Sequence, residues 1–229
     1  MRHQPGERAR LPRNDGKTVE RPPCGEYRLN EIGAKEVSEG PMAIPKAKPV
    51  GPYPGWRYYP LSEKPGNWAT QLVGVVAGAR PAIDSATVIG LTSDTVLQHL
   101  RPGLLGLGYE VEGGKTKALK IRRPVLFGDR GLERVAYEVD GVHDAVGVLL
   151  EVEAGRGARG NAVYRDLVRT SLIVGARYLA LGVMRDYHHL SGGRPIDVAS
   201  YAETVDQLDA IYASGRLSLQ FDGVLVFGY

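Results

Sequence analysis

The segment from Tyr137 to Gly155, YEVDGVHDAVGVLLEVEAG, constrains the fold of this chain more than any other part of it. It predicts two antiparallel strands joined by a turn at Asp144 to Gly147, with Asp140 opposite Glu151. Because side chains alternate between the two faces of a strand, this register places Asp140, Glu151 and Glu153 on one face. The segment therefore predicts three carboxylates near one point of a sheet.

The second strand of this pair, residues 146–154, is apolar until its end, where Glu151 and Glu153 stand. Burying paired carboxylates among Val and Leu is costly unless an opposite charge compensates, and a hard cation such as Mg²⁺ suits oxygen ligands. The carboxyl edge of a strand is also where α/β sheets bind ligands. The alternative is a solvated sheet face on which acidic residues happen to alternate.

Composition restricts the class of protein. The chain is 43% hydrophobic and 24% charged, as in globular domains, and its formal charge of +3 is compatible with a polyanionic partner without requiring one. Cys24 is the only cysteine, which excludes an internal disulfide and a thiolate metal site. The sequence shows neither an apolar run of membrane-helix length nor the apolar stretch of a secretion signal, so we expect a cytoplasmic protein with no membrane partner.

Two regions are predicted along the chain. Residues 1–60 form a Pro-rich, basic N-terminal extension, and residues 61–229 form the domain. The extension is interpreted as a flexible tail that its aromatic residues tether to the domain. A basic arm lying along a nucleic-acid backbone is the alternative, which the interspersed glutamates disfavour.

Within the domain, hydrophobic periodicity predicts an α/β (α+β) fold with a mixed central β-sheet flanked by helices. The strand at 146–154, the helix at 161–174 and the strand at 177–184 have the lengths of a crossover unit. The other expected elements are a helix capped by Asn67, a helix opened by Ser93 and Asp94, a hairpin about Gly113 and Gly114, a helix over 200–213 and a strand over 221–229.

Basic side chains follow the acidic strand directly. Arg156 and Arg159 lie in the loop after it, and Arg165 and Arg169 lie four residues apart, on one face of the next helix. Carboxylates beside a basic helix start suggest a metal ion that meets a phosphate, so these four arginines are the expected contacts to a nucleic-acid backbone.

A strand bearing Asp, a turn, and an apolar strand ending in Glu-x-Glu, followed by a helix and a strand, resembles the PD-(D/E)XK nuclease superfamily. The resemblance is to type II restriction-endonuclease-like members, in the E-x-E variant of the motif, and covers residues 93–185. It implies a restriction-endonuclease-like fold in which Asp140 and Glu151 bind Mg²⁺ or Mn²⁺. Glu153 stands at the motif's lysine position, where the residue orients or deprotonates the attacking water.

Three roles are open to Glu153: binding a second ion, acting as the base, or marking a site that has lost catalysis. Lys115, Lys117 or Lys120 are candidates to supply the missing positive charge from a neighbouring strand, and Lys115 and Lys117 are also expected to contact nucleic acid. Asp144 is a rival for the first acid, but its place in the turn sets it farther from Glu151.

The implied activity is metal-dependent hydrolysis of DNA, with Asp140, Glu151 and Glu153 as the catalytic residues. The resemblance also makes a homodimer a possible state, because a two-fold dimer suits cutting of both strands. An inactive module that keeps the fold and binds nucleic acid or a protein is the alternative function. RNA or a nucleic-acid end is an alternative substrate.

Overall fold

The computed structural model of this chain describes residues 52–155 and 161–229. The chain divides into two units, Met1–Ala47 and Lys48–Tyr229, of which the first lies outside the described residues. The second unit carries the sheet and the predicted site.

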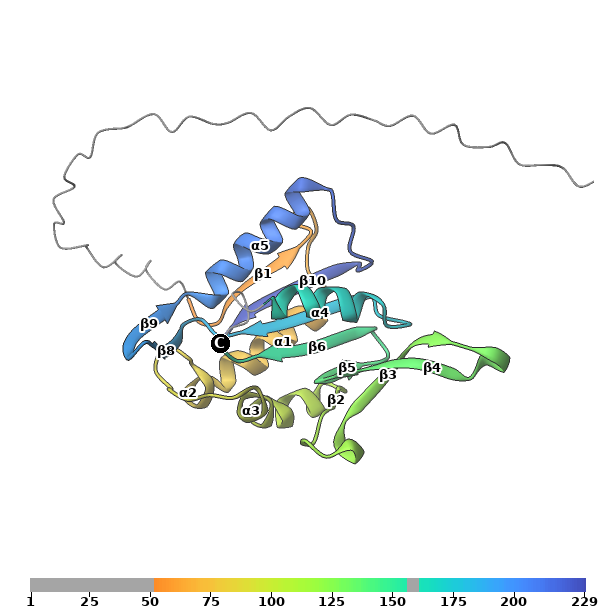
Figure 1. The fold of residues 1–229 in the computed structure, drawn as a ribbon, viewed down its shortest axis with the longest axis horizontal. Helices are drawn as coiled ribbons and strands as arrows, with labels where there is room; N and C mark the ends of the chain where they lie inside the picture. Colours follow the sequence, from red (N-terminus) through yellow and green to blue (C-terminus); the bar gives the residue numbers. More distant parts are fainter. Residues whose placement is uncertain (1–51, 156–160) are drawn as a thin grey trace, which may run out of the picture. The chain divides into compact units, whose positions relative to one another are not determined.

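A mixed sheet of six strands forms the centre of this unit (Figure 1). Its strands in spatial order are β1 (Gly55–Tyr59), β10 (Gly223–Gly228), β7 (Tyr178–Val183), β6 (Val148–Glu153), β5 (Gly141–His143) and β2 (Glu110–Val111). The three central strands, β10, β7 and β6, run parallel, and each outer strand is antiparallel to its neighbour. The predicted α/β class with a mixed sheet is confirmed.

Strand β1 corrects the predicted boundary between extension and domain. Gly55 to Tyr59 pair along their length with β10, and the Tyr59 side chain is fully buried. The sheet therefore includes residues that the sequence prediction placed in the extension ending at residue 60. Three of the aromatic residues expected to tether a tail, Trp56, Tyr58 and Tyr59, belong instead to this edge strand.

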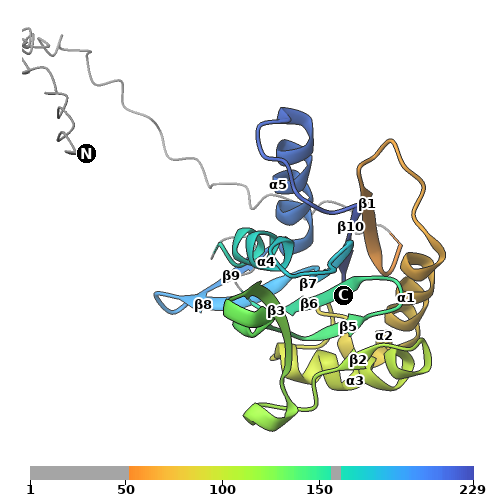
Figure 2. The ribbon, with the colours of Figure 1, turned by 90° about the vertical axis from the view of Figure 1, so that its right-hand side faces the viewer.

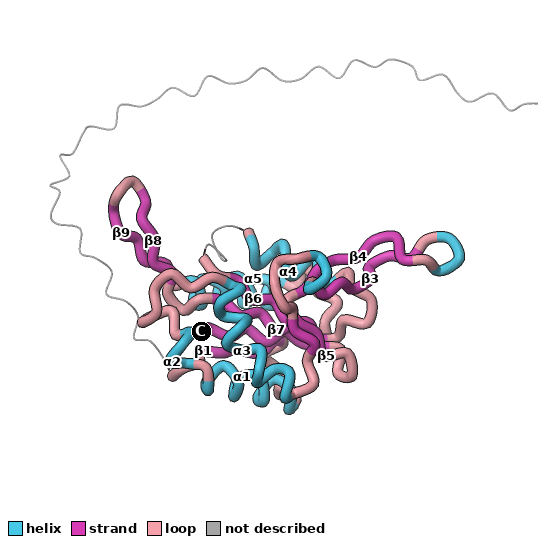
Figure 3. The backbone as a smooth tube through the Cα atoms, turned by 90° about the horizontal axis from the view of Figure 1, so that it is seen from below, coloured by secondary structure: helices cyan, strands magenta, loops and turns pink. Residues whose placement is uncertain are grey.

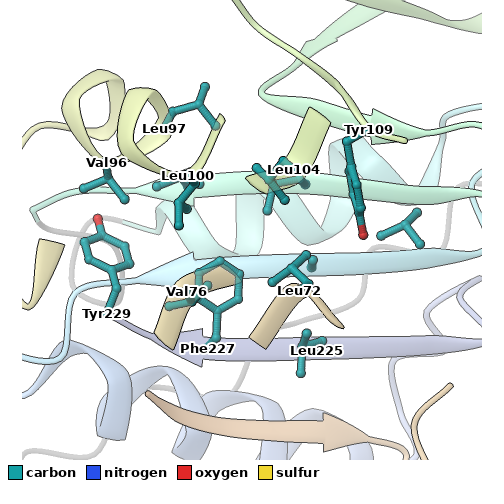
Figure 4. Packing of buried hydrophobic residues seen from close by; sticks show 14 of the residues in the cluster. Leu72, Val76, Val96, Leu97, Leu100, Leu104, Tyr109, Leu225, Phe227 and Tyr229 are labelled. Carbon is teal, nitrogen blue, oxygen red and sulfur yellow. The ribbon is translucent and has the colours of Figure 1, made fainter. Parts of the chain in front are cut away.

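Helices cover both faces of the sheet in separate layers, as Figure 2 shows. On one face lie α1 (Asn67–Gly78), α2 (Arg80–Ile83) and α3 (Ser93–Gly106), and on the other α4 (Ala162–Ser171) and α5 (Ser200–Ser214). Figure 4 shows leucines and valines of α1 and α3 gathered against Leu225 and Phe227 of β10. Each face thus has its own apolar core.

Both parallel connections pass through a helix. Chain order runs from β6 through α4 to β7, and from β7 through α5 to β10, as the periodicity predicts. Helix α3 begins at Ser93 as expected, with the Thr92 hydroxyl accepting a hydrogen bond from Thr95 N at 3.1 Å. The predicted cap at Asn67 is wrong: Gly66 is the N-cap of α1, and no side chain caps it.

The hairpin predicted about Gly113 and Gly114 is also wrong. Residues 110–111 pair with β5, and a 3₁₀ helix (Lys117–Leu119) connects them to β3 (Ile121–Phe127). Strand β3 pairs with β4 (Glu133–Val139) instead. The two glycines favour a local turn, but pairing of β2 with β5 buries Val111 at the sheet edge and is formed instead.

Two hairpins project from opposite ends of the domain, as Figure 3 shows. One is β3–β4. The other, β8 (Tyr187–Ser191) with β9 (Arg194–Val198), was not predicted, although Gly192 and Gly193 stand between its strands. Both glycines have positive φ, 58° and 76°, which a tight hairpin turn requires. In the described part of the chain, no helix is long and apolar enough to cross a membrane.

Candidate active site

The predicted register of the acidic hairpin is confirmed. Gly141 pairs with Leu150 and His143 with Val148, so Asp140 lies where the ladder would place it opposite Glu151. Residues 144–147 form the turn. One part of the prediction fails: the first strand is split, because residues 133–139 pair with β3 and only residues 141–143 pair with β6.

Asp140 occupies the break between β4 and β5. Its Oδ2 accepts a hydrogen bond from the Val152 N–H of β6 at 2.8 Å, so the carboxylate takes the place of a ladder acceptor. Asp144, the rival first acid, is 73% exposed in the turn and pairs with Arg123 at 2.9 Å. The structure therefore associates Asp140, and not Asp144, with the end of β6.

Two acidic residues that the sequence did not single out join this cluster. The backbone N–H of Glu112 donates to the Asp140 carbonyl at 2.8 Å, and the buried Glu112 carboxylate pairs with Lys120 Nζ at 2.5 Å. Asp166 of α4 is 2% exposed, and Arg165 Nε donates to its Oδ1 at 2.9 Å. The pairing of β2 with β5 and the packing of α4 on β6 bring these residues in from distant segments.

The cluster carries more negative than positive charge in a poorly solvated place, and its pKa values reflect this. Burial, with the nearby charges of Glu112 and Asp166, raises the pKa of Asp140 to about 6, although the Val152 hydrogen bond and Lys120 oppose the shift. Burial and then the charge of Asp140 raise the pKa of Glu151 well above its usual range. Poor solvation, and after it like-charge repulsion, thus disfavours full ionisation of this cluster.

Glu153 behaves in a similar way at the edge of the cluster. Burial, and next a hydrogen bond with Asp166, raises its pKa to about 7, while Arg165 acts in the opposite direction. The Arg165 guanidinium donates to both carboxylates and so bridges Glu153 and Asp166. In addition, the Tyr229 hydroxyl donates to the Glu153 carbonyl at 2.8 Å and fixes this end of β6.

The structure places the predicted phosphate contacts in different surroundings. Arg165 and Arg169 share a face of α4 as predicted, but this face points to the acids: Arg169 lies 5.0 Å over the Tyr137 ring and its charge lowers the pKa of Glu151. Lys115 pairs with Asp94 at 2.9 Å, and Lys117 lies in the 3₁₀ helix with an exposed side chain. Arg156 and Arg159 lie outside the described residues.

Of the three lysine candidates, Lys120 is the one whose charge acts on the cluster. It lies immediately before β3, and its charge lowers the pKa of Asp140. The hydrogen bond to Glu112, with the charges of Glu112, Glu138 and Asp140, raises the pKa of Lys120 itself. The ammonium group therefore acts on the cluster from the side of Asp140. In the sequence, Lys120 is far from the Glu-x-Glu segment, residues 151–153.

In residues 52–155 and 161–229, no three His, Cys, Asp or Glu side chains form a group that could hold a metal ion. The predicted convergence of three carboxylates on one point is therefore not seen, and Glu153 pairs with Arg165 instead. Asp140 and Glu151 remain as two half-buried acids with raised pKa values. Such a pair fits Mg²⁺, which proteins commonly hold through one or two carboxylates, with water and substrate phosphate as the other ligands.

Comparisons of this chain with models of known protein families, with curated proteins and with solved structures gave no match. The chemistry of this site therefore rests on its residues alone.

Proposed function

We propose that this protein is a metal-dependent nuclease that hydrolyses DNA phosphodiester bonds, with a restriction-endonuclease-like fold and the E-x-E variant of the PD-(D/E)XK motif. The observation that carries the proposal is the pair of half-buried acids, Asp140 and Glu151, at the carboxyl end of an apolar parallel strand. Their raised pKa values mark a poorly solvated place where negative charge exceeds positive charge, and a divalent cation would offset that excess.

Asp140 and Glu151 would hold Mg²⁺ or Mn²⁺. When bound, such an ion lowers the pKa of a coordinated water and offsets negative charge on a phosphate. The hydrogen bond from Val152 N fixes the orientation of the Asp140 carboxylate, so one of its two oxygens is already committed. The other oxygen is the one that would face the ion.

Glu153 would accept the proton of the attacking water. A pKa of about 7 leaves a substantial fraction of this carboxylate ionised at neutral pH while keeping it basic enough to take a proton, which is the range that suits a general base. Arg165 holds its orientation through the shared contact with Asp166. Lys120 would supply the positive charge that the motif's lysine position lacks, from the Asp140 side of the site.

Substrate phosphates would be held by basic residues. Arg156 and Arg159 follow the strand directly in sequence, and Arg169 carries no ion-pair partner among the described residues. Lys115 and Lys117 lie on the connection between β2 and β3 and would contact the nucleic acid farther from the cleaved bond.

The test is incubation of supercoiled plasmid with pure protein and Mg²⁺ or Mn²⁺. We expect nicking or linearisation that Asp140→Ala and Glu151→Ala each reduce by at least about 100-fold, and that Lys120→Met reduces less. Asp144→Ala, an exposed acid in the adjacent turn, is the matched control and should cut normally. Cleavage that survives both Asp140→Ala and Glu151→Ala contradicts the site. Parallel incubations with single-stranded RNA and with linear DNA that has free ends would identify the preferred substrate.

A second candidate function is a module that keeps this fold and binds nucleic acid or a protein without catalysis. It is favoured by the pairing of Glu153 with Arg165 and by the lack of a three-ligand group among the described residues. It predicts salt-dependent DNA binding that Asp140→Ala and Glu151→Ala leave intact, with no cutting in either metal.

A further inference from the structure

The acidic end of β6 is paired with a neighbouring strand on one side only. Among the described residues, β5 pairs with β6 over residues 148–150, whereas β7 pairs with β6 along its whole length. Glu151 and Glu153 therefore stand on the part of the strand that β5 does not reach. A strand end held from one side opens more readily than one held from both sides, because fewer backbone hydrogen bonds must break.

Two side chains supply hydrogen bonds to this end of the strand. The Asp140 carboxylate accepts from the Val152 N–H, and the Tyr229 hydroxyl donates to the Glu153 carbonyl, each at 2.8 Å. Asp140 directly precedes β5, so it extends the support that this strand gives. Tyr229 follows β10, and β7 lies between β10 and β6, so the Tyr229 side chain has to reach across β7. Figure 4 shows its hydroxyl pointing away from β10.

Tyr229 is itself held in place by contacts on its backbone and its ring. Its N–H donates to the Val183 carbonyl at 3.0 Å, and its own carbonyl accepts from the Arg185 N–H at 2.9 Å. The buried Ser85 hydroxyl donates to the same carbonyl. The Tyr229 side chain is fully buried in the core between the sheet and helices α1 and α3. A side chain that is fixed in this way can hold another residue in position.

The surroundings of the Tyr229 hydroxyl keep it a hydrogen-bond donor. Burial, with the charges of Glu153 and Asp140 nearby, raises the pKa of this phenol. The hydroxyl therefore retains its proton throughout the pH range in which the site would work. A backbone carbonyl only accepts, so the direction of the hydrogen bond to Glu153 is fixed.

A second tyrosine of the same core, Tyr109, provides a comparison. It is 3% exposed, and its hydroxyl has no hydrogen-bond partner among the described residues. Its ring packs edge-on against His143 at the end of β5. Tyrosine is thus buried in this core without a hydrogen bond, so packing alone does not account for the contact of Tyr229 with Glu153.

We infer that Tyr229 is a positioning residue of the proposed nuclease site, which holds the acidic end of β6 in place from across β7. Together with Asp140 it takes the place of the strand neighbour beyond Leu150. By fixing the Glu153 backbone, it keeps the carboxylate that would accept the water proton beside Glu151. This role rests on the proposed function, because it is defined by the reaction of Glu153.

Tyr229→Phe removes the hydroxyl and keeps the ring, so it tests this role directly. In single-turnover cleavage of plasmid with Mn²⁺, we expect the rate at saturating protein to fall about 10-fold, because a small displacement of a reacting group is costly. The protein concentration that gives half of this rate should stay the same. Tyr109→Phe is the matched control, and should cut at the wild-type rate because it removes a hydroxyl that has no partner among the described residues.

A double-mutant cycle shows whether Tyr229 acts through Glu153. In the Glu153→Gln background, Tyr229→Phe should cause no further loss of the residual rate, because the group that it positions is already removed. A hydroxyl that acts on the fold as a whole would lower the rate by the same factor in both backgrounds.

Hydrogen exchange gives a readout that does not depend on activity. The backbone amides of residues 151–155 should exchange faster in Tyr229→Phe than in wild type, because this end of β6 opens more often. The same amides in Tyr109→Phe should exchange at the wild-type rate.

The outcomes separate this inference from the proposed function. Wild-type cleavage that Tyr229→Phe leaves unchanged, or equal losses with and without Glu153, overturns the role of Tyr229 and leaves the proposed function standing. Equal exchange in the two phenylalanine variants also overturns it. A wild type that cuts with neither metal contradicts the proposed function and the positioning role with it, and the exchange difference then still decides whether Tyr229 holds the end of β6.

Discussion

The two faces of strand β6 differ sharply although they belong to the same six residues. On the α1–α3 face, Val148, Leu150 and Val152 are all buried in one apolar core. On the α4 face, Leu149 enters the other core, but Glu151 and Glu153 follow it. Strand β6 therefore contributes to both apolar cores, and its side chains change from apolar to acidic on one face only, at its carboxyl end.

The apolar residues of β6 stabilise the fold, whereas the acidic residues of the same strand do not. The apolar face removes side chains from water and stabilises the sheet. The acidic face collects Glu112, Asp140 and Asp166 beside Glu151, and the loss of hydration at these acids, together with repulsion between their charges, opposes folding. A set of acids that lowers stability points to a role in binding or catalysis.

Adjacent substitutions on β6 should have effects of opposite sign. Leu150→Ala removes a fully buried side chain and should lower the free energy of unfolding by about 2–5 kcal/mol. Glu151→Gln removes one of several like charges from a poorly solvated cluster and should raise the free energy of unfolding at pH 8 without metal. Urea titration measures both, with Asp144→Asn in the exposed turn as the neutral control. A Glu151→Gln variant less stable than wild type would mean that the acid supports the fold.

The pH dependence of stability should sharpen the same contrast, with a smaller effect. The pKa of Glu153 rises from its usual range to about 7 in the folded protein, so the folded state binds the proton more tightly than the unfolded chain. Its contribution is fully present below about pH 4 and is lost as pH rises through about 7.

Glu153→Gln should therefore gain stability relative to wild type from about pH 4.5 to about 7 and keep a constant advantage of about 2 kcal/mol above that. Denaturant midpoints in metal-free buffers at each pH measure this difference. A difference that does not change with pH would show that Arg165 already keeps Glu153 ionised throughout.

The sequence predicted the parts of the site that depend on local pattern. A turn placed at Asp144 to Gly147 defined the register of Asp140 against β6, and the apolar run before Glu151 identified the buried strand. Glu112 and Asp166 could not be found in this way. Glu112 reaches the cluster because β2 pairs with β5. Asp166 reaches it because α4 packs on the sheet with the side that carries Asp166 and its partner Arg165 toward the acids.

The β3–β4 hairpin shows the same limit. Residues 133–139 have the alternation of a strand, but their partner is β3, whereas the sequence prediction placed Tyr137 to Val139 in a strand paired with residues 146–154. The Asp140 backbone is where the chain leaves one sheet for the other, and this transition depends on competition between two partners that local periodicity does not reveal.

Titration calorimetry with Mn²⁺ in the absence of nucleic acid tests the central claim, that the acidic face of β6 holds a divalent cation through Asp140 and Glu151. We predict saturable binding near pH 7, and heats that vary with the ionisation enthalpy of the buffer, because binding displaces protons from acids with raised pKa values. Asp140→Asn and Glu151→Gln should each abolish that binding, whereas Asp144→Asn should retain it. Absence of binding to wild type, or equal binding to all three variants, would contradict the account.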